Sequence, residues 1–160
     1  MCPCYSLTFV SNIEIVSCHD PAEFPALARI WRRSVESTHV FLTREDVDFY
    51  APKVADSYLP AVNLRVARIG GRTVGFSGTD GNKLEMLFID DNYRGRGVGG
   101  ALLGEALDRI PRLELDVNEQ NPHAVAFYRR HGFVIVGRSE IDADGRPFPL
   151  LHMVSGAAST

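Results

Sequence analysis

The stretch Tyr93-Arg94-Gly95-Arg96-Gly97-Val98-Gly99-Gly100 decides how this sequence is interpreted. It follows an apolar, strand-like segment at residues 84–89 and leads into a helix-like segment at residues 101–110. Glycine lets the backbone approach an anion closely and adopt positive φ. The first N–H groups of a helix lack intrahelical partners and lie at the positive end of its dipole. The sequence therefore predicts a phosphate-binding loop between a strand and a helix.

The same glycines also match the G-x-G-x-x-G pattern of dinucleotide-binding proteins, read as Gly95, Gly97 and Gly100. Residues 90–94 separate the strand from the first glycine, whereas that pattern needs the glycine directly after the strand. The loop also lies past the middle of the chain, which leaves too little sequence for a doubly wound sheet. A nicotinamide-binding protein is therefore disfavoured.

Hydrophobic periodicity predicts one mixed α/β domain at residues 12–154, between a flexible extension at 1–11 and a frayed tail at 155–160. Two helices are expected in the first part of the chain. The first begins at Asp20-Pro21, and the second begins at a capping box of Thr43 with Asp46 and runs toward Tyr58. Strands are expected at residues 12–16, 64–69, 73–78, 84–89, 113–117, 133–136 and 150–154, and later helices at 101–110 and 123–130. Because a helix links strands 84–89 and 113–117, these two are predicted to be parallel neighbours.

Composition excludes several classes of function. The chain has 160 residues, 45% of them hydrophobic, with a net charge of −3 and a pI near 5.9. This balance argues against nucleic-acid binding, and the absence of a leader or membrane-length apolar run predicts a cytoplasmic protein with no membrane partner. Cys2-Pro3-Cys4 has no second ligand pair, so no metal site is expected.

Several ordered motifs together resemble a known family. The loop fits the pattern Q/R-x-x-G-x-G/A from Arg94 to Gly99. Further matching pieces are Thr38-His39-Val40-Phe41-Leu42, Leu87-Phe88-Ile89-Asp90, Val117-Asn118-Glu119-Gln120-Asn121, Ala126-Phe127-Tyr128, Gly132-Phe133, Gly137-Arg138-Ser139-Glu140 and Pro149-Leu150-Leu151. From about Ile13 to Met153 the chain resembles the GNAT family of acetyl-CoA-dependent N-acetyltransferases, and within it the YjaB-type bacterial subgroup.

This resemblance implies an α/β fold with a mixed, mostly antiparallel sheet, a central parallel strand pair and flanking helices. It implies transfer of an acetyl group from acetyl-CoA to a primary amine by direct attack in a ternary complex. The acceptor would be a protein lysine, an N-terminus or a small amine, and the protein a homodimer. A non-catalytic acetyl-CoA sensor is the alternative function.

The resemblance also assigns residues to the donor. Backbone groups of Leu87, Phe88 and Ile89 would bind the pantetheine arm, and the loop residues Arg94, Gly95, Arg96, Gly97, Val98 and Gly99 would bind the pyrophosphate. Asn121 would contact the cofactor, although its position as a helix cap explains it equally well. Tyr128 would protonate the departing thiolate, which needs only modest tuning because a phenol has a pKa of ~10 and a thiol ~8.5.

The acceptor amine needs a base, since a lysine-like amine has a pKa of ~10.4. Glu85 is the preferred candidate because strand alternation would place Glu85, Leu87 and Ile89 on one face. Asp116, by resemblance to some relatives, and a water chain are the alternatives, and Glu85 could equally be an exposed hairpin flank. His39 is expected near the acceptor, outside the catalytic set.

Overall fold

The computed structural model describes residues 12–156, so Cys2 and Cys4 lie outside the described residues. The strands are β1 (Ile13–Cys18), β2 (Asn63–Ile69), β3 (Arg72–Asp80), β4 (Lys83–Ile89), β5 (Glu114–Asn118), β6 (Val134–Ser139) and β7 (Leu150–Val154). The α-helices are α2 (Phe24–Thr38), α3 (Arg44–Lys53), α4 (Val98–Arg109) and α5 (Pro122–Arg130). Short 3-10 or π-helical turns are η1 (Pro21–Glu23), η2 (Val54–Tyr58), η3 (Leu59–Ala61) and η4 (Asp91–Tyr93).

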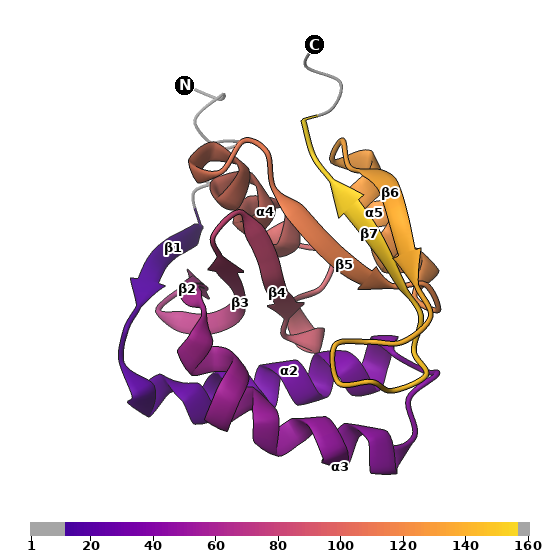
Figure 1. The fold of residues 1–160 in the computed structure, drawn as a ribbon. Coiled ribbons are helices and arrows are strands. Elements are labelled where there is room, and N and C mark those ends of the chain that lie inside the picture. Colours follow the sequence, from indigo (N-terminus) through magenta and orange to yellow (C-terminus); the bar gives the residue numbers. More distant parts are fainter. Residues whose placement is uncertain (1–11, 157–160) are drawn as a thin grey trace.

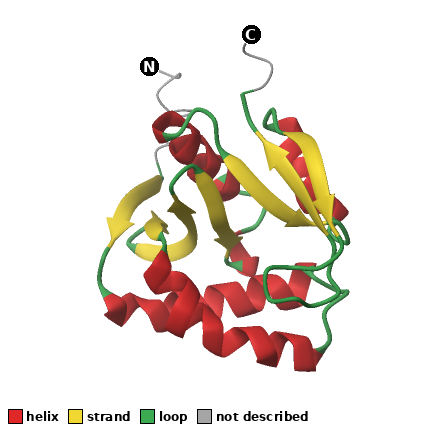
Figure 2. Cartoon of the chain, in the orientation of Figure 1, coloured by secondary structure: helices red, strands yellow, loops and turns green. Residues whose placement is uncertain are grey.

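The seven strands form one sheet in the order β1-β2-β3-β4-β5-β7-β6. Helices α2 and α3 pack below it in the view of Figure 1, and α4 and α5 lie behind it (Figures 1 and 2). Neighbouring strands are antiparallel except β4 and β5, which α4 connects and which run parallel. The predicted mixed sheet with a central parallel pair is therefore confirmed. None of the helices in residues 12–156 is long and apolar enough to cross a membrane.

The helix signals in the sequence act as predicted, with one exception. The Thr43 hydroxyl accepts a hydrogen bond from the Asp46 N–H at 3.1 Å, and the Asp46 carboxylate accepts one from the Thr43 N–H at 2.8 Å. The helix that they begin was predicted to run toward Tyr58, but regular α-helix ends at Lys53 and a π-helical turn follows. Pro52 lies in the last α-helical turn, and its missing N–H and its ring disrupt the hydrogen-bond ladder there.

Strand β4 contains a bulge that changes which way its side chains point. Thr79 of β3 pairs with Leu84 and Gly78 pairs with Met86, so Glu85 is an extra residue in β4. Leu84 consequently packs with the core on the α4–α5 side, whereas Met86 packs on the α2 side.

The bulge also overturns a predicted alignment. Leu87 and Ile89 face the α4 side, while the Glu85 carboxylate lies near Lys83, which reaches Asp116 on the α2 side. The expectation that Glu85, Leu87 and Ile89 share one face is therefore wrong, because the extra residue shifts the alternation by one position.

The pairing of β4 with β5 is short. It joins Lys83 to Glu114 and Leu84 to Leu115, after which the strands diverge (Figure 1). Beyond Leu84, the edge of β4 that faces β5 is therefore not paired with that strand, and its backbone groups can bind a ligand.

The ordered core reaches slightly past the predicted domain end at residue 154. The buried Ser155 hydroxyl accepts a hydrogen bond from the Leu113 N–H at 2.8 Å and donates one to the Pro111 carbonyl at 3.0 Å. Ser155 is therefore part of the packed domain and not of a frayed tail.

Candidate active site

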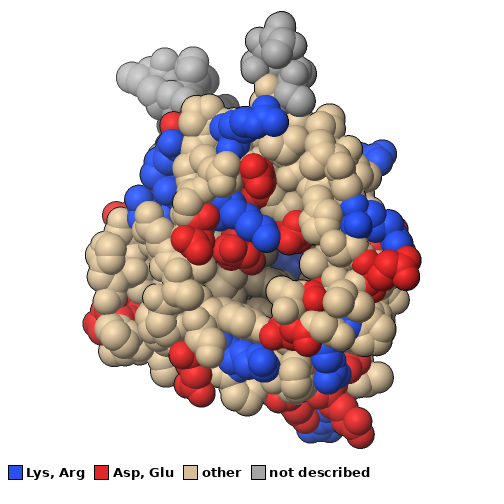
Figure 3. All heavy atoms as spheres, in the orientation of Figure 1, with Lys and Arg blue, Asp and Glu red and all other residues tan. Residues whose placement is uncertain are grey.

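A cleft of about 650 Å³ opens where β4 and β5 diverge. Figure 3 shows a hollow near the centre of this face, with acidic and basic side chains around it. The predicted site residues that line the cleft are Glu85, Leu87, Phe88, Ile89, Arg94, Gly95, Gly97, Val98, Gly99, Asn121 and Tyr128. The structure thus brings together every predicted site residue except Arg96, which is not among the lining residues.

The glycine loop places backbone donors at one end of this cleft. Gly95 and Gly97 have φ values of +77° and +83°, a left-handed conformation that glycine adopts without steric cost. Gly97 is the N-cap of α4 and offers no side chain to its first turn. Residues 98–100 are the first of the helix, so their N–H groups have no intrahelical acceptor. This end of the cleft therefore suits an anion.

A glycine in β3 lets the start of α4 lie close to the sheet. A Cβ atom on Gly75 would be 3.1 Å from Val98 Cγ1 and 3.0 Å from Ile89 Cδ1. Such distances are shorter than ordinary van der Waals contact, so a larger residue would push α4 away from the end of β4. Gly75 thus helps to set the distance between the anion-binding turn and the strand.

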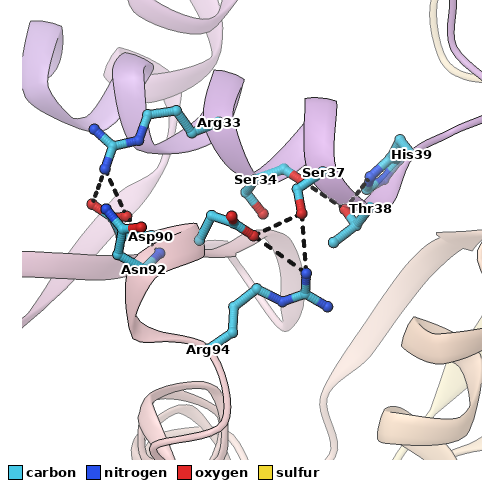
Figure 4. A network of polar contacts seen from close by, with 9 residues as sticks. Arg33, Ser34, Ser37, Thr38, His39, Asp90, Asn92 and Arg94 are labelled. Atoms are coloured by element: carbon cyan, nitrogen blue, oxygen red, sulfur yellow. Dashed lines mark hydrogen bonds and ion pairs between the residues drawn. The ribbon is translucent and has the colours of Figure 1, made fainter.

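The segment between β4 and the glycine loop is fixed to α2 by polar contacts (Figure 4). The buried Asp90 carboxylate accepts hydrogen bonds from Arg33 at 2.9 and 3.1 Å and from the Asn92 N–H at 3.0 Å. Arg94 reaches toward α2 and donates to the Ser37 hydroxyl at 3.1 Å and to Asp91 at 3.3 Å. These contacts hold the turn that precedes the loop.

Both loop arginines have protein partners here. Arg94 binds Ser37 and Asp91, and the Arg96 guanidinium lies 5.1 Å from the centre of the Tyr93 ring. The expected convergence of two guanidinium groups on one phosphate is therefore not the arrangement that the structure has. Arg94 lines the cleft and Arg96 does not, so at most one of the two guanidinium groups lies at this end of the cleft.

Tyr128 lines the cleft from α5. Its ring packs edge-on against Phe127 and Phe133, at centroid distances of 5.3 and 5.6 Å. Burial raises the pKa of the Tyr128 hydroxyl above its usual value, so the phenol keeps its proton at neutral pH. Asn121, which is buried, caps α5 by accepting a hydrogen bond from the Ala124 N–H at 3.2 Å and so orients the helix that carries Tyr128.

Two carboxylates reach the cleft with a lysine between them. Glu85 and Asp116 both line it, and Lys83 Nζ lies 2.8 Å from Asp116 Oδ2 and 4.0 Å from Glu85 Oε1. Burial acts to raise the pKa of Asp116, but hydrogen bonds from Lys83 and His152 outweigh it and lower the pKa. The bond to Asp116 in turn raises the pKa of Lys83. Sequence reasoning named both carboxylates and missed the lysine.

A smaller cavity of about 150 Å³ adjoins the cleft, and the two share His39, Phe88 and Asn118 as lining residues. Its other lining residues are Trp31, Val35, Leu42, Tyr50, Tyr58, Asp142 and Phe148. The segment between β6 and β7 closes this cavity, because the Tyr50 hydroxyl donates to Asp142 and the Tyr58 hydroxyl donates to Asp144 at 2.6 Å. The sequence predicted only a turn here, and no short motif indicated that it meets α3 and η2.

His39 gives the folded state a measurable pH dependence. Burial lowers the pKa of its imidazole to about 4, whereas an unfolded histidine has a pKa of ~6.5. Between these values the unfolded chain binds a proton that the folded chain does not, so this group makes stability fall as the pH drops from ~6.5 to ~4, by at most ~3 kcal/mol. Urea unfolding across this range should show a shallower dependence in His39→Gln than in the wild type. Identical slopes would show that His39 does not contribute.

Comparison with known proteins agrees with this geometry. Residues 38–154 match the family described as "Acetyltransferase (GNAT) domain". The chain is 43% identical over 141 residues to the peptidyl-lysine N-acetyltransferase YjaB of Escherichia coli, covering 86% of this chain and 92% of that protein.

Solved structures show the same likeness. The solution structure of apo-form YjaB from Escherichia coli superposes with a TM-score of 0.83 at 41% identity, over 91% of this chain and 99% of that one. The PaiA N-acetyltransferase of Thermoplasma acidophilum, in complex with coenzyme A, shares the fold with a TM-score of 0.72 at 20% identity, over 89% and 98% of the two chains. The chain therefore belongs to the GNAT family and is an N-acetyltransferase.

Proposed function

We propose that this enzyme acetylates lysine side chains of peptides or proteins, with acetyl-CoA bound in the cleft between β4 and β5. The observation that carries the proposal is the small cavity that joins the cleft at Phe88. Its aromatic walls suit the apolar stem of a lysine and attract its cationic end, and Asp142 adds a carboxylate. The relative YjaB is itself named a peptidyl-lysine N-acetyltransferase, which supports the same acceptor class.

The donor is held mainly by the backbone in this proposal. The pyrophosphate lies on the N–H groups of the loop from Gly95 to Gly99, at the start of α4. The pantetheine arm runs along Leu87, Phe88 and Ile89 and pairs with the edge of β4 that β5 leaves open, as an extended peptide does when it adds to a sheet edge. A free N–H on this edge polarises the thioester carbonyl, an effect typically worth ~3 kcal/mol per donor.

The chemistry then requires one base and one acid. Glu85 takes a proton from the acceptor ammonium, and the freed lone pair forms a bond to the thioester carbon. The carbon–sulfur bond breaks, and the departing thiolate takes the Tyr128 hydroxyl proton. The second proton of the amine nitrogen returns to Tyr128, so each turnover gives an amide, free coenzyme A and one proton. The positions of Tyr128 and of the two carboxylates in the cleft support these roles.

Glu85→Gln tests the base. We expect kcat to fall by roughly 100-fold, the usual contribution of a general base, with the dissociation constant of acetyl-CoA unchanged. Thiol release with a lysine peptide measures this, and Glu14→Gln on the exposed side of β1 is the matched control. A Glu85→Gln enzyme with normal kcat would transfer the role to Asp116.

The acceptor class is tested with three peptides of one sequence. The first carries a lysine and a blocked N-terminus, the second has arginine in place of that lysine, and the third has the arginine and a free N-terminus. We expect rapid thiol release with the first peptide alone. Faster release with the third would show that the enzyme prefers α-amines.

A further inference from the structure

A chain of hydrogen bonds leads from the cleft across three strands to the edge of the sheet. Asp116 Oδ1 on β5 lies 2.5 Å from His152 Nδ1 on β7, and His152 Nε2 lies 2.6 Å from Ser139 Oγ on β6. Asp116 lines the cleft, whereas β6 is the last strand of the sheet. The chain thus connects the place where the amine reacts with the solvent-exposed edge.

The imidazole of His152 occupies a shaped position within this chain. Strand β6 has a register shift between Ile135 and Gly137, and Gly137 pairs with His152. A Cβ atom on Gly137 would lie 3.3 Å from His152 Cδ2, so a side chain there would crowd the ring. Each ring nitrogen has a partner, and the two contacts align the imidazole along the line from β5 to β6.

The reaction creates a need for such a path. Each turnover converts an ammonium group into an amide and leaves one proton in the cleft. The carboxylates there cannot keep it, because the next acceptor also has to be deprotonated.

We propose that Asp116, His152 and Ser139 form a proton relay that carries the acceptor's proton from the cleft to the surface. The inference rests on the proposed function, since it needs an ammonium acceptor. In one transfer, Glu85 first passes the acceptor's proton through water in the cleft to Asp116 Oδ1. Asp116 then gives this proton to His152 Nδ1, while His152 Nε2 gives its proton to Ser139 Oγ and the original Ser139 proton passes to water. Asp116 ends as a carboxylate and the imidazole ends with its proton on Nδ1. The ring regains its starting tautomer by exchange with water, Nδ1 losing a proton and Nε2 gaining one, because the His152 side chain is 34% exposed.

The charges at the entrance of the relay gather around Lys83 and Asp116. Lys83 lies among the carboxylates of Asp116, Glu85 and Glu114, while β6 contributes the neutral Ser139 and Gly137 beside the imidazole. Lys83 binds the Asp116 oxygen that His152 does not use and lies within 4.0 Å of Glu85. Lys83 therefore orients Asp116 and brings the two carboxylates together at the entrance of the relay.

Replacing His152 tests the relay. His152→Gln keeps a polar side chain able to bridge Asp116 and Ser139 but cannot pass a proton, so we expect kcat to fall about 10- to 100-fold with KM for acetyl-CoA unchanged. In His152→Ala, added imidazole should restore thiol release in a saturable way, because it fills the vacated position beside Gly137. Ser139→Ala should lose less, since water can take its place. His19→Gln and His19→Ala at an exposed position are the matched controls, and imidazole should stimulate neither.

The outcomes separate the two proposals. Wild-type activity in His152→Gln, or a folded His152→Ala enzyme that imidazole does not stimulate, would overturn the relay while leaving lysine acetylation intact. Absence of thiol release by the wild type with every lysine peptide would instead overturn the proposed function. Thermal melting and coenzyme A binding check that each variant is folded. If the His152 variants are not folded, the kcat of Ser139→Ala tests the relay in their place.

Discussion

Tyr128→Phe should lower kcat by roughly 100- to 1,000-fold and leave the dissociation constant of acetyl-CoA nearly unchanged. The substitution removes one oxygen and keeps the ring that packs on Phe127 and Phe133, so the fold and the cleft should be preserved. What is lost is a neutral donor whose proton goes to the departing thiolate, and a positioned acid typically contributes 10²–10⁴ in rate. Thiol-release kinetics with calorimetry of coenzyme A binding measure both quantities.

A change of leaving group shows whether this loss reflects acid catalysis. A donor analogue whose thiol is more acidic than that of coenzyme A needs less help to leave, so Tyr128→Phe should slow it much less. An equal loss with both donors, or a normal kcat with acetyl-CoA, would remove Tyr128 as the acid.

Gly97→Asp should weaken binding of acetyl-CoA by about 100-fold, which corresponds to ~2.7 kcal/mol. Gly97 has φ +83° and is the N-cap of α4, so its substitution strains the turn and adds a negative charge where the pyrophosphate is proposed to bind. Aspartate tolerates the left-handed region better than most residues, which favours a folded protein. Calorimetry with coenzyme A gives the change directly.

Gly104→Asp is the matched control, because it adds the same charge to the same helix. A Cβ atom on Gly104 would meet nothing within 4 Å, so the protein should fold and bind the donor normally. If both variants lost affinity equally, the effect would come from charge alone and not from the turn at Gly97.

The sequence was sufficient for the fold and for most of the residues that line the cleft. Turn glycines, the capping box at Thr43 and the helix between two apolar strands are local signals, and each predicts its element from nearby residues. The loop from Arg94 to Gly99, Asn121 and Tyr128 were recognised because they belong to ordered motifs. The structure places all of these except Arg96 along one cleft.

The sequence did not predict the features that depend on strand register or on contacts between segments far apart in the chain. One extra residue at Glu85 reverses side-chain alternation, and periodicity gives no sign of it. His152 faces Asp116 only because β7 pairs with β5 in that register. The contact of Asp142 with Tyr50 likewise joins segments far apart in the chain. The homodimer and the cytoplasmic location remain predictions.

The most direct test of the account compares free thiol with acetyl-lysine in one reaction. Wild-type enzyme is incubated with saturating acetyl-CoA and a lysine peptide whose N-terminus is blocked, and both products are followed over time. The account predicts that they appear together in equal amounts, and only when donor and peptide are both present. Thermal stabilisation by coenzyme A without thiol release from any lysine peptide would contradict it.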